Sequence, residues 1–301
     1  MRKALIVYNP ASRNAPRRER LLGAAASVHA VGWEIEVTPT AAPGHGTDLA
    51  REAVKSGVEV VFACGGDGTI NEVINGLAGS ETALAVLRGG MGNVFAKEIG
   101  VPRAHDAAIR VLVDGERRRF DLGLAGDRHF LLMAGIGFDA AVVRRVPSAH
   151  KRLLGSASYG LHAAIELTRY QPTPASLTLD GEAWQGDLFW ALVGNTRSYG
   201  GIINVTSQAR VDDGHLDAYV FSGRGARWLA DMAQKLVRGR QDGAEGVIFR
   251  RLREASVDTP GLPVQADGEY FGETPMTFGV APAALDVLLP RGKGQHLFGA
   301  N

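Results

Sequence analysis

Short apolar runs alternate with helix-like segments over roughly the first 120 residues of the chain. The runs are rich in Val, Ile, Leu and Ala, as in strands that are buried on both faces, and the segments between them repeat apolar positions at helical spacing. This alternation predicts βαβ units and a mostly parallel sheet covered by helices on both faces. The expected strands are Ala4–Tyr8, Glu34–Thr38, Val58–Ala63 and Ala83–Leu87, and the expected helices are Arg17–His29, Thr47–Lys55, Ile70–Leu77, Val94–Glu98 and Asp106–Val113.

After about Phe120 the apolar runs lie closer together, and Asp-Gly turn signals separate them. This change predicts a Rossmann-like α/β domain over residues 1–123 and a mainly antiparallel β domain over residues 124–301, with a return of the last residues to the first domain left open. The expected helices of the second half are Leu153–Tyr170 and Arg227–Val237, and its expected strands are Phe130–Met133, Ser176–Leu179, Leu188–Val193, Leu216–Phe221, Glu254–Asp258, Val264–Ala266, Met276–Val280 and Leu285–Leu289.

The composition sets limits on the class of protein. A chain of 301 residues with 45% hydrophobic and 22% charged residues is long enough for two globular cores. Its net charge of +1 gives no reason to expect a nucleic-acid partner. The single cysteine, Cys64, ends an apolar run, so we expect it in the core of a protein from a reducing compartment. There is no signal-peptide pattern and no apolar stretch of about 20 residues, so the sequence predicts a cytoplasmic location.

A glycine-rich loop directly follows the strand expected at Val58–Ala63 and precedes a helix. Thr69 and Glu72 have the spacing of a capping box, in which each side chain accepts a hydrogen bond from a free backbone amide. The other amides of the first turn, the helix dipole and the glycines favour a bound phosphate. A carboxylate at Asp67 would repel a lone phosphate, so we expect Mg²⁺ between the two. The segment reads Cys64-Gly65-Gly66-Asp67-Gly68-Thr69-Ile70-Asn71-Glu72.

A tight strand-to-helix turn is the plain alternative for this loop, because glycine and aspartate also build such turns. It is not a Walker loop, since no Lys-Ser/Thr pair follows it, and it is not the dinucleotide pattern of a first strand. A second loop, Arg88–Asn93, follows the next expected strand. Loops after successive parallel strands open on the same edge of a sheet, and Asn9 and Thr40 would reach that edge too.

The GGDGT-x-N-E segment resembles the nucleotide loop of the diacylglycerol kinase catalytic-domain family, which includes sphingosine kinases and bacterial soluble lipid kinases. GGDGT also occurs in NAD kinases, so the segments further along the chain are what distinguish lipid kinases from NAD kinases. These segments agree with the family in order and cover nearly the whole chain. They are Asn9-Pro10, the Thr40 region with Pro43-Gly44-His45, Asp121-Leu122-Gly123, Ala134–Asp139, Val193-Gly194-Asn195, Asp212–Asp217 and Gln265–Glu269.

The resemblance implies an NAD kinase/diacylglycerol kinase-like fold, in which the second domain, residues 124–301, is a β-sandwich. It also implies an ATP- and Mg²⁺-dependent lipid kinase acting on a diacylglycerol-like lipid. It implies Glu269 as general base, with Asp67 and Asp121 in the Mg²⁺ network at the phosphates. It also implies a structural metal, held by the Asp213 side chain and the backbone carbonyls of Arg210 and His215. The ATP contacts that it implies are Asn9, Thr40, Gly65, Gly66, Asp67, Gly68, Thr69, Asn71, Glu72, Met91 and Asn93.

Several alternatives stay open. Without the resemblance, Asp267-Gly268 and Asp213-Gly214 are simply turns. In the second loop, Met91 and Val94 replace a threonine and an aspartate that many relatives carry, and Arg88 either pairs with a phosphate or faces solvent. An NAD kinase, or a pseudokinase that binds lipid or nucleotide without turnover, therefore remains an alternative.

Three basic clusters stand out in the sequence, and a solvated face is the default interpretation of each: Arg117–Arg119, Arg144-Arg145 and His150–Arg152. For a substrate that resides in a bilayer, the residues from Arg144 to Arg152 are also a hypothetical contact with anionic headgroups, which would place the protein at the inner membrane face. The histidines lack the spacing of a zinc site. A homodimer is a further expectation from the resemblance.

Overall fold

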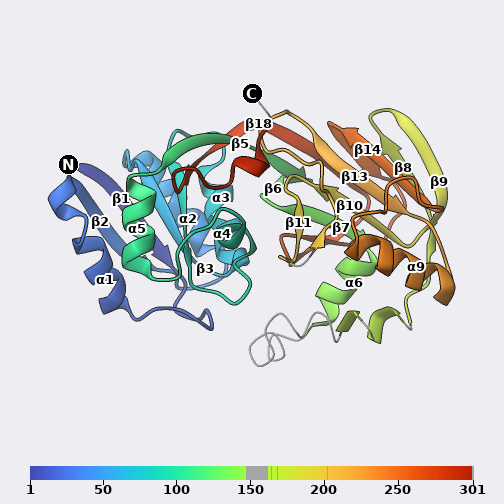
Figure 1. The fold of residues 1–301 in the computed structure, drawn as a ribbon, viewed down its shortest axis with the longest axis horizontal. Helices are drawn as coiled ribbons and strands as arrows, with labels where there is room; N and C mark the ends of the chain where they lie inside the picture. The colour runs from blue at the N-terminus through green and yellow to red at the C-terminus, as the bar shows by residue number, and fades with distance from the viewer. Residues whose placement is uncertain (147–161, 164, 168, 202, 300–301) are drawn as a thin grey trace. The chain divides into compact units, whose positions relative to one another are not determined.

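The computed structural model describes residues 1–146, 162–163, 165–167, 169–201 and 203–299, and these form two compact units (Figure 1). Unit 1 comprises Met1–Asp121 and Ala283–Asn301, and unit 2 comprises Leu122–Pro282. The chain passes between the units twice, within the strands β5 (Glu116–Ala125) and β18 (Met276–Leu289). In the part of the chain that is described, no helix is both long and apolar enough to cross a bilayer.

Unit 1 is built on a parallel sheet. Its strand order is β2-β1-β3-β4, with the second half of β18 added beside β4, and each neighbouring pair among β1 to β4 is parallel. The carboxyl ends of β1 to β4 therefore lie along one edge, which confirms the α/β prediction. The strands are β1 (Arg2–Tyr8), β2 (Trp33–Pro39), β3 (Val60–Gly65) and β4 (Ala83–Arg88).

The helices of unit 1 cover both faces of this sheet. Right-handed crossovers from β1 to β2 and from β2 to β3 run in opposite directions, so they put their helices on opposite faces. Accordingly α1 packs on α5, and α2 packs on α3. Gly76 permits the second contact, because a Cβ there would lie 2.5 Å from the Ala50 Cβ. The helices are α1 (Arg18–Ala26), α2 (His45–Lys55), α3 (Asp67–Leu77), α4 (Val94–Glu98) and α5 (His105–Val113), with short 3-10 turns η1 (His29–Val31) and η2 (Gln295–Leu297).

Unit 2 is a sandwich of antiparallel strands, as the sequence predicts. One sheet has the order β14-β13-β10-β7-β16-β17, and β15, β8, β9 and the first half of β18 form the other layer. Apolar residues from both layers form a common core, among them Ile136, Val193 and Phe278. The strands are β6 (Arg128–Phe130), β7 (Met133–Gly137), β8 (Thr173–Leu179), β9 (Glu182–Leu188), β10 (Trp190–Gly194), β11 (Ser198–Tyr199), β12 (Ile203–Asn204), β13 (Leu216–Phe221), β14 (Val247–Leu252), β15 (Glu254–Val257), β16 (Pro263–Ala266) and β17 (Glu269–Glu273).

Two helices of unit 2 are α6 (Phe138–Arg145) and α9 (Ala226–Val237). The second matches a predicted helix closely, whereas the first follows the β7 strand without having been predicted. Of the helix predicted over Leu153–Tyr170, residues 153–161, 164 and 168 lie outside the described residues, while 162–163 and 165–167 are helical.

Several predicted element boundaries are wrong. The run Phe130–Met133 is divided between β6 and β7, and Leu188–Val193 is divided at Phe189 between β9 and β10. The two strands predicted at Met276–Val280 and Leu285–Leu289 are one continuous strand, β18. The sequence analysis also missed β5, because its first half carries three arginines and only half of its positions are buried.

Candidate functional site

The first glycine loop joins β3 to α3 in unit 1. Gly66 is extended and precedes the helix, and the first intrahelical bond runs from the Ile70 amide to the Gly66 carbonyl (3.2 Å). Among the residues that the structure describes, no side chain caps this end of the helix. The amides of the first turn therefore have no intrahelical partner, and the positive end of the helix dipole adds to their attraction for an anion.

The predicted capping box between Thr69 and Glu72 is wrong. The helix begins two residues before Thr69, whose hydroxyl instead accepts a hydrogen bond from the Asn9 Nδ2 (3.3 Å). The Glu72 carboxylate accepts the backbone amides of Gly44 and Gly46 at 2.9 and 3.0 Å. Glu72 thus caps α2, the neighbouring helix, and fixes the chain that follows Thr40.

The second glycine loop lies directly against the first. The Gly89 amide and the Asn93 Nδ2 both donate to the Gly65 carbonyl, at 3.2 and 2.8 Å. The Asn93 Oδ1 accepts the Gly90 amide at 3.0 Å, and a Cβ on Gly90 would lie 2.9 Å from the Gly66 nitrogen. The two loops are therefore one structure, and Gly90 has no room for a side chain.

Asp67 connects the two loops. Its Oδ1 accepts the amide of Val94, the first residue of α4, at 2.9 Å. Because this bond uses the backbone of Val94, the valine at this position does not disturb it. Arg88 is half-buried, and its Nη2 donates to the Ala96 carbonyl (3.4 Å), so a contact between Arg88 and a phosphate stays a prediction. Burial, and then the nearby Arg103, lower its pKa.

The segment after β1 contributes contacts that the sequence analysis missed. The Arg13 Nη1 lies 3.1 Å from the Met91 sulfur, and the Asn14 Nδ2 donates to the Gly90 carbonyl at 3.1 Å. Both residues follow a strand whose carboxyl end lies on the loop edge, which is the signal that would have found them. Thr40 follows the adjacent strand, and its amide donates to the Tyr8 carbonyl (2.8 Å). Asn71 lies in α3 and is buried.

In unit 2, Glu269 follows a tight turn between β16 and β17. Asp267 and Gly268 both have positive φ, at 50° and 81°. The Asp267 carboxylate is buried and accepts three backbone amides, those of Leu131, Leu132 and Met133, at 2.8 to 3.2 Å. The turn is thereby held against the β6–β7 connection, and Glu269 itself is exposed.

The residues predicted to hold metal lie in different surroundings. Asp121 is buried in β5, where its Oδ1 accepts the Ala283 amide (2.6 Å). Asp213 accepts the His215 amide through Oδ1 (2.9 Å), and Arg251 donates to its Oδ2. Arg251 thus supplies the positive charge beside Asp213, and a metal ion at this turn stays a prediction. Arg210 lies half-buried in the same loop.

Among the described residues, no three His, Cys, Asp or Glu side chains converge as a metal site. A magnesium ion between carboxylates and phosphate oxygens does not require such a cluster, because ATP and water supply most of its ligands. Cys64 is buried, as predicted, and burial raises the pKa of its thiol to about 12.

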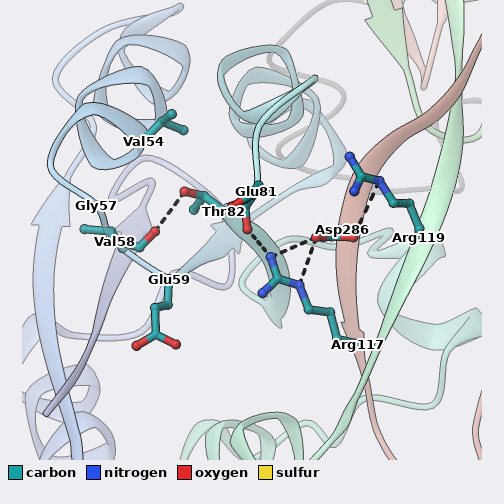
Figure 2. A pocket seen from close by; sticks show the side chains of 9 residues that line it. All are labelled: Val54, Gly57, Val58, Glu59, Glu81, Thr82, Arg117, Arg119 and Asp286. Carbon is teal, nitrogen blue, oxygen red and sulfur yellow. Dashed lines mark hydrogen bonds and ion pairs between the residues drawn. The ribbon is translucent and has the colours of Figure 1, made fainter.

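A cavity of about 560 Å³ lies at the other edge of the unit 1 sheet, where β3 and β4 begin (Figure 2). Arg117 and Arg119 of β5 both turn toward Asp286, with 2.9 Å between Arg117 Nε and the Asp286 Oδ2. The Arg118 guanidinium lies 4.1 Å from the centre of the Phe298 ring. This basic cluster is therefore engaged within unit 1, and the cavity lies away from the glycine loops.

Two family models match the chain. The diacylglycerol kinase catalytic domain matches residues 3–125, and the YegS C-terminal NAD kinase beta sandwich-like domain matches residues 133–289. Among curated relatives, a diacylglycerol kinase of Bacillus subtilis is 29% identical, with 99% of both chains covered. A probable lipid kinase, YegS-like, of Chromohalobacter salexigens is 32% identical and covers 95% of this chain and 93% of its own.

A solved structure shares the fold. The crystal structure of a putative diacylglycerol kinase from Bacillus anthracis str. Sterne has a TM-score of 0.78 to this chain at 22% identity, and 97% and 98% of the two chains are covered. This likeness confirms the predicted fold class.

Proposed function

Because the chain belongs to the diacylglycerol kinase catalytic-domain family of lipid kinases, we propose that it transfers the γ-phosphate of ATP to the hydroxyl of a diacylglycerol-like lipid in a Mg²⁺-dependent reaction. The product would be phosphatidic acid or an analogue. The observation that carries this proposal is the pair of stacked glycine loops at the start of α3.

The phosphates of ATP are proposed to bind at the first turn of α3. Backbone amides without intrahelical partners and the helix dipole attract the anion, and glycine at position 66 leaves open space, since a Cβ there would have no neighbour within 4 Å. Asp67 and Asp121 are the carboxylates that would hold Mg²⁺, which neutralises charge on the phosphate oxygens. Arg13, beside the second loop, adds a further positive charge.

Glu269 is proposed as the general base. Its carboxylate would accept the proton of the lipid hydroxyl as that oxygen attacks the γ-phosphate. The hydrogen bonds from three amides to Asp267 restrict the turn before Glu269, and such restriction is what a positioned base requires. Exposure of Glu269 leaves it accessible to a substrate.

Incubation with labelled ATP and Mg²⁺, in the presence of diacylglycerol micelles or of NAD, tests this function. Label in phosphatidic acid supports the lipid kinase, and label in NADP would establish an NAD kinase instead. Label in neither product, together with measurable ATP binding, would indicate a pseudokinase.

A membrane-surface contact is a separate proposal. Arg144 pairs with Glu273 (2.7 Å), and Arg145 pairs with the buried Glu166 (3.1 Å), so both arginines are already engaged within unit 2. His150–Arg152 lie outside the described residues. If this stretch contacts anionic headgroups, the protein should bind anionic vesicles more tightly than neutral ones, and equal binding would refute the contact.

A further inference from the structure

A buried carboxylate begins α6 in unit 2. Asp139 is 3% exposed, and its Oδ1 accepts the Ala140 amide at 2.7 Å. Its Oδ2 accepts the Gln265 Nε2 at 2.9 Å. Burial raises the pKa of this carboxyl to about 7, although the hydrogen bond from Gln265 opposes that effect. A Cβ on Gly135 of β7 would overlap the Asp139 carboxylate, so the strand leaves room for this group.

Gln265 extends the connection to the turn before Glu269. Its side chain is 3% exposed, and its Oε1 accepts the Gly268 amide at 2.9 Å. The Gln265 side chain therefore donates through Nε2 to Asp139 of α6 and accepts through Oε1 from the turn. Gly268 immediately precedes Glu269, so this hydrogen bond acts one peptide away from the proposed base.

The other end of α6 contacts the same hairpin. The Arg144 Nη1 lies 2.7 Å from the Glu273 Oε1, and the Arg144 guanidinium lies 5.6 Å from the centre of the Tyr270 ring. Glu273 ends β17, whereas Glu269 begins it. α6 is thus bonded near both ends of the strand that carries Glu269.

Each partner restrains a different side of the turn. Asp267 attaches the turn to the β6–β7 connection, and Gln265 attaches it to α6. Glu269 begins β17, an exposed strand at the edge of its sheet, and without these restraints its side chain would sample several orientations. A misplacement of about 1 Å can lower a reaction rate about 10²-fold.

We infer that Asp139 and Gln265 are positioning residues for Glu269, and that α6 and the β16–β17 hairpin act as one rigid element. This inference rests on the proposed role of Glu269 as base. Neither residue needs to touch the substrate, since both act through the Gly268 amide.

Three variants of the pair test the inference: Asp139→Asn, Gln265→Glu, and the double variant that carries both changes. In Gln265→Glu, two carboxyl groups face each other across the 2.9 Å contact, and they repel when both are ionised, so the variants are compared at a pH above the raised pKa of Asp139. In Asp139→Asn, the new side chain has one oxygen and one NH₂ group. Because Gln265 and the Ala140 amide both donate, the NH₂ group must face one of these donors, and that hydrogen bond is lost. In the double variant, the new asparagine donates to the new glutamate, whose second oxygen still accepts the Gly268 amide.

We expect each single change to lower kcat by about tenfold to 10²-fold with little change in the KM for ATP, and the double variant to recover most of the loss. Hydrogen exchange of the segment 263–273 should accelerate in the single variants and return toward normal in the double variant. Gln234→Glu, an exposed glutamine of α9, is the matched control and should change neither quantity.

Faster exchange in the single variants with an unchanged kcat would overturn the inference, because the turn would then be loosened without consequence for transfer. A double variant no better than the single ones would also overturn it. Absence of phosphate transfer by the unaltered chain would instead remove the proposed function, and the positioning role with it. The two failures are therefore distinguishable.

Discussion

The candidate regions of unit 1 and unit 2, each taken by itself, are held together by different kinds of contact. At the glycine loops of unit 1, backbone atoms contact backbone atoms, as between the Gly89 amide and the Gly65 carbonyl. At the Glu269 turn of unit 2, buried side chains hold the backbone, as Asp267 and Gln265 do. The first arrangement depends on close backbone contacts at its glycines, beside the side-chain bonds of Asn93 and Asp67, so its glycines fail through added bulk. The second fails through the loss or reversal of single hydrogen bonds.

The largest expected effect concerns the base. Glu269→Gln should lower kcat by about 10²–10⁴-fold, because the glutamine cannot accept the hydroxyl proton. The Kd of ATP should stay nearly unchanged, and single-turnover kinetics with calorimetry would measure both quantities. Glu182→Gln, at the exposed start of β9, is the control. Weaker ATP binding with normal kcat would contradict the division of labour between the two units.

Added bulk at the loop contact should come next. Gly90→Ala would bring a Cβ against the backbone of Gly66, which cannot move aside as a flexible side chain can. We expect a loss of about 1–3 kcal/mol of unfolding free energy and a weaker affinity for ATP. Gly23→Ala in α1 is the matched control, since its Cβ would meet nothing within 4 Å. Normal ATP binding by the Gly90 variant would show that loop stacking is not needed for the site.

A smaller and more selective effect is expected at the start of α3. Gly66→Ala adds a Cβ to open space, so the stability of the fold should change little. The same methyl group would hinder a phosphate that approaches the backbone, and we expect the affinity for ATP to fall about tenfold, or ~1.4 kcal/mol. Equal loss of stability and affinity, measured by thermal unfolding and calorimetry, would speak against a phosphate at this position.

The smallest expected effect is a dependence of stability on pH, caused by a buried carboxyl group in unit 2. Asp217 of β13 is 2% exposed, burial raises its pKa to about 7, and within the described part of the chain its Oδ2 has no hydrogen-bond partner. A carboxyl with a raised folded-state pKa stabilises the fold below its unfolded pKa, and this contribution is lost as the pH rises toward 7.

Asp217→Asn removes this titration. The melting temperature of the variant should match that of the wild type near pH 4 and exceed it by a few degrees at pH 8. Thermal unfolding across this range measures the difference. A difference that does not grow with pH would mean that Asp217 stays ionised without cost, in which case Arg251 and Arg197 compensate for its burial.

The glycine loops of unit 1 could be predicted from the sequence better than the side-chain contacts around the Glu269 turn of unit 2. Glycines after two apolar runs predict loops at the edge of a parallel sheet. In the structure these loops are connected by the hydrogen bond from Asn93 to the Gly65 carbonyl. The capping box failed because Glu72 has its partners in α2, 26 and 28 positions away. The link between Asp139 and Gln265 spans 126 positions, and no local pattern indicates such a pair.

The two crossings of the chain between the units have a consequence for synthesis. Unit 1 is incomplete after Asp121, since residues from Ala283 onward supply the strand that pairs with β4 through Val287 and Leu84. All of Leu122–Pro282, 161 residues, must leave the ribosome first, which takes roughly 8–32 s at about 5–20 residues per second. During that interval the edge of β4 is an unpaired, apolar strand. An unpaired apolar strand edge can pair with another chain, so this edge is an aggregation hazard until its partner strand is made.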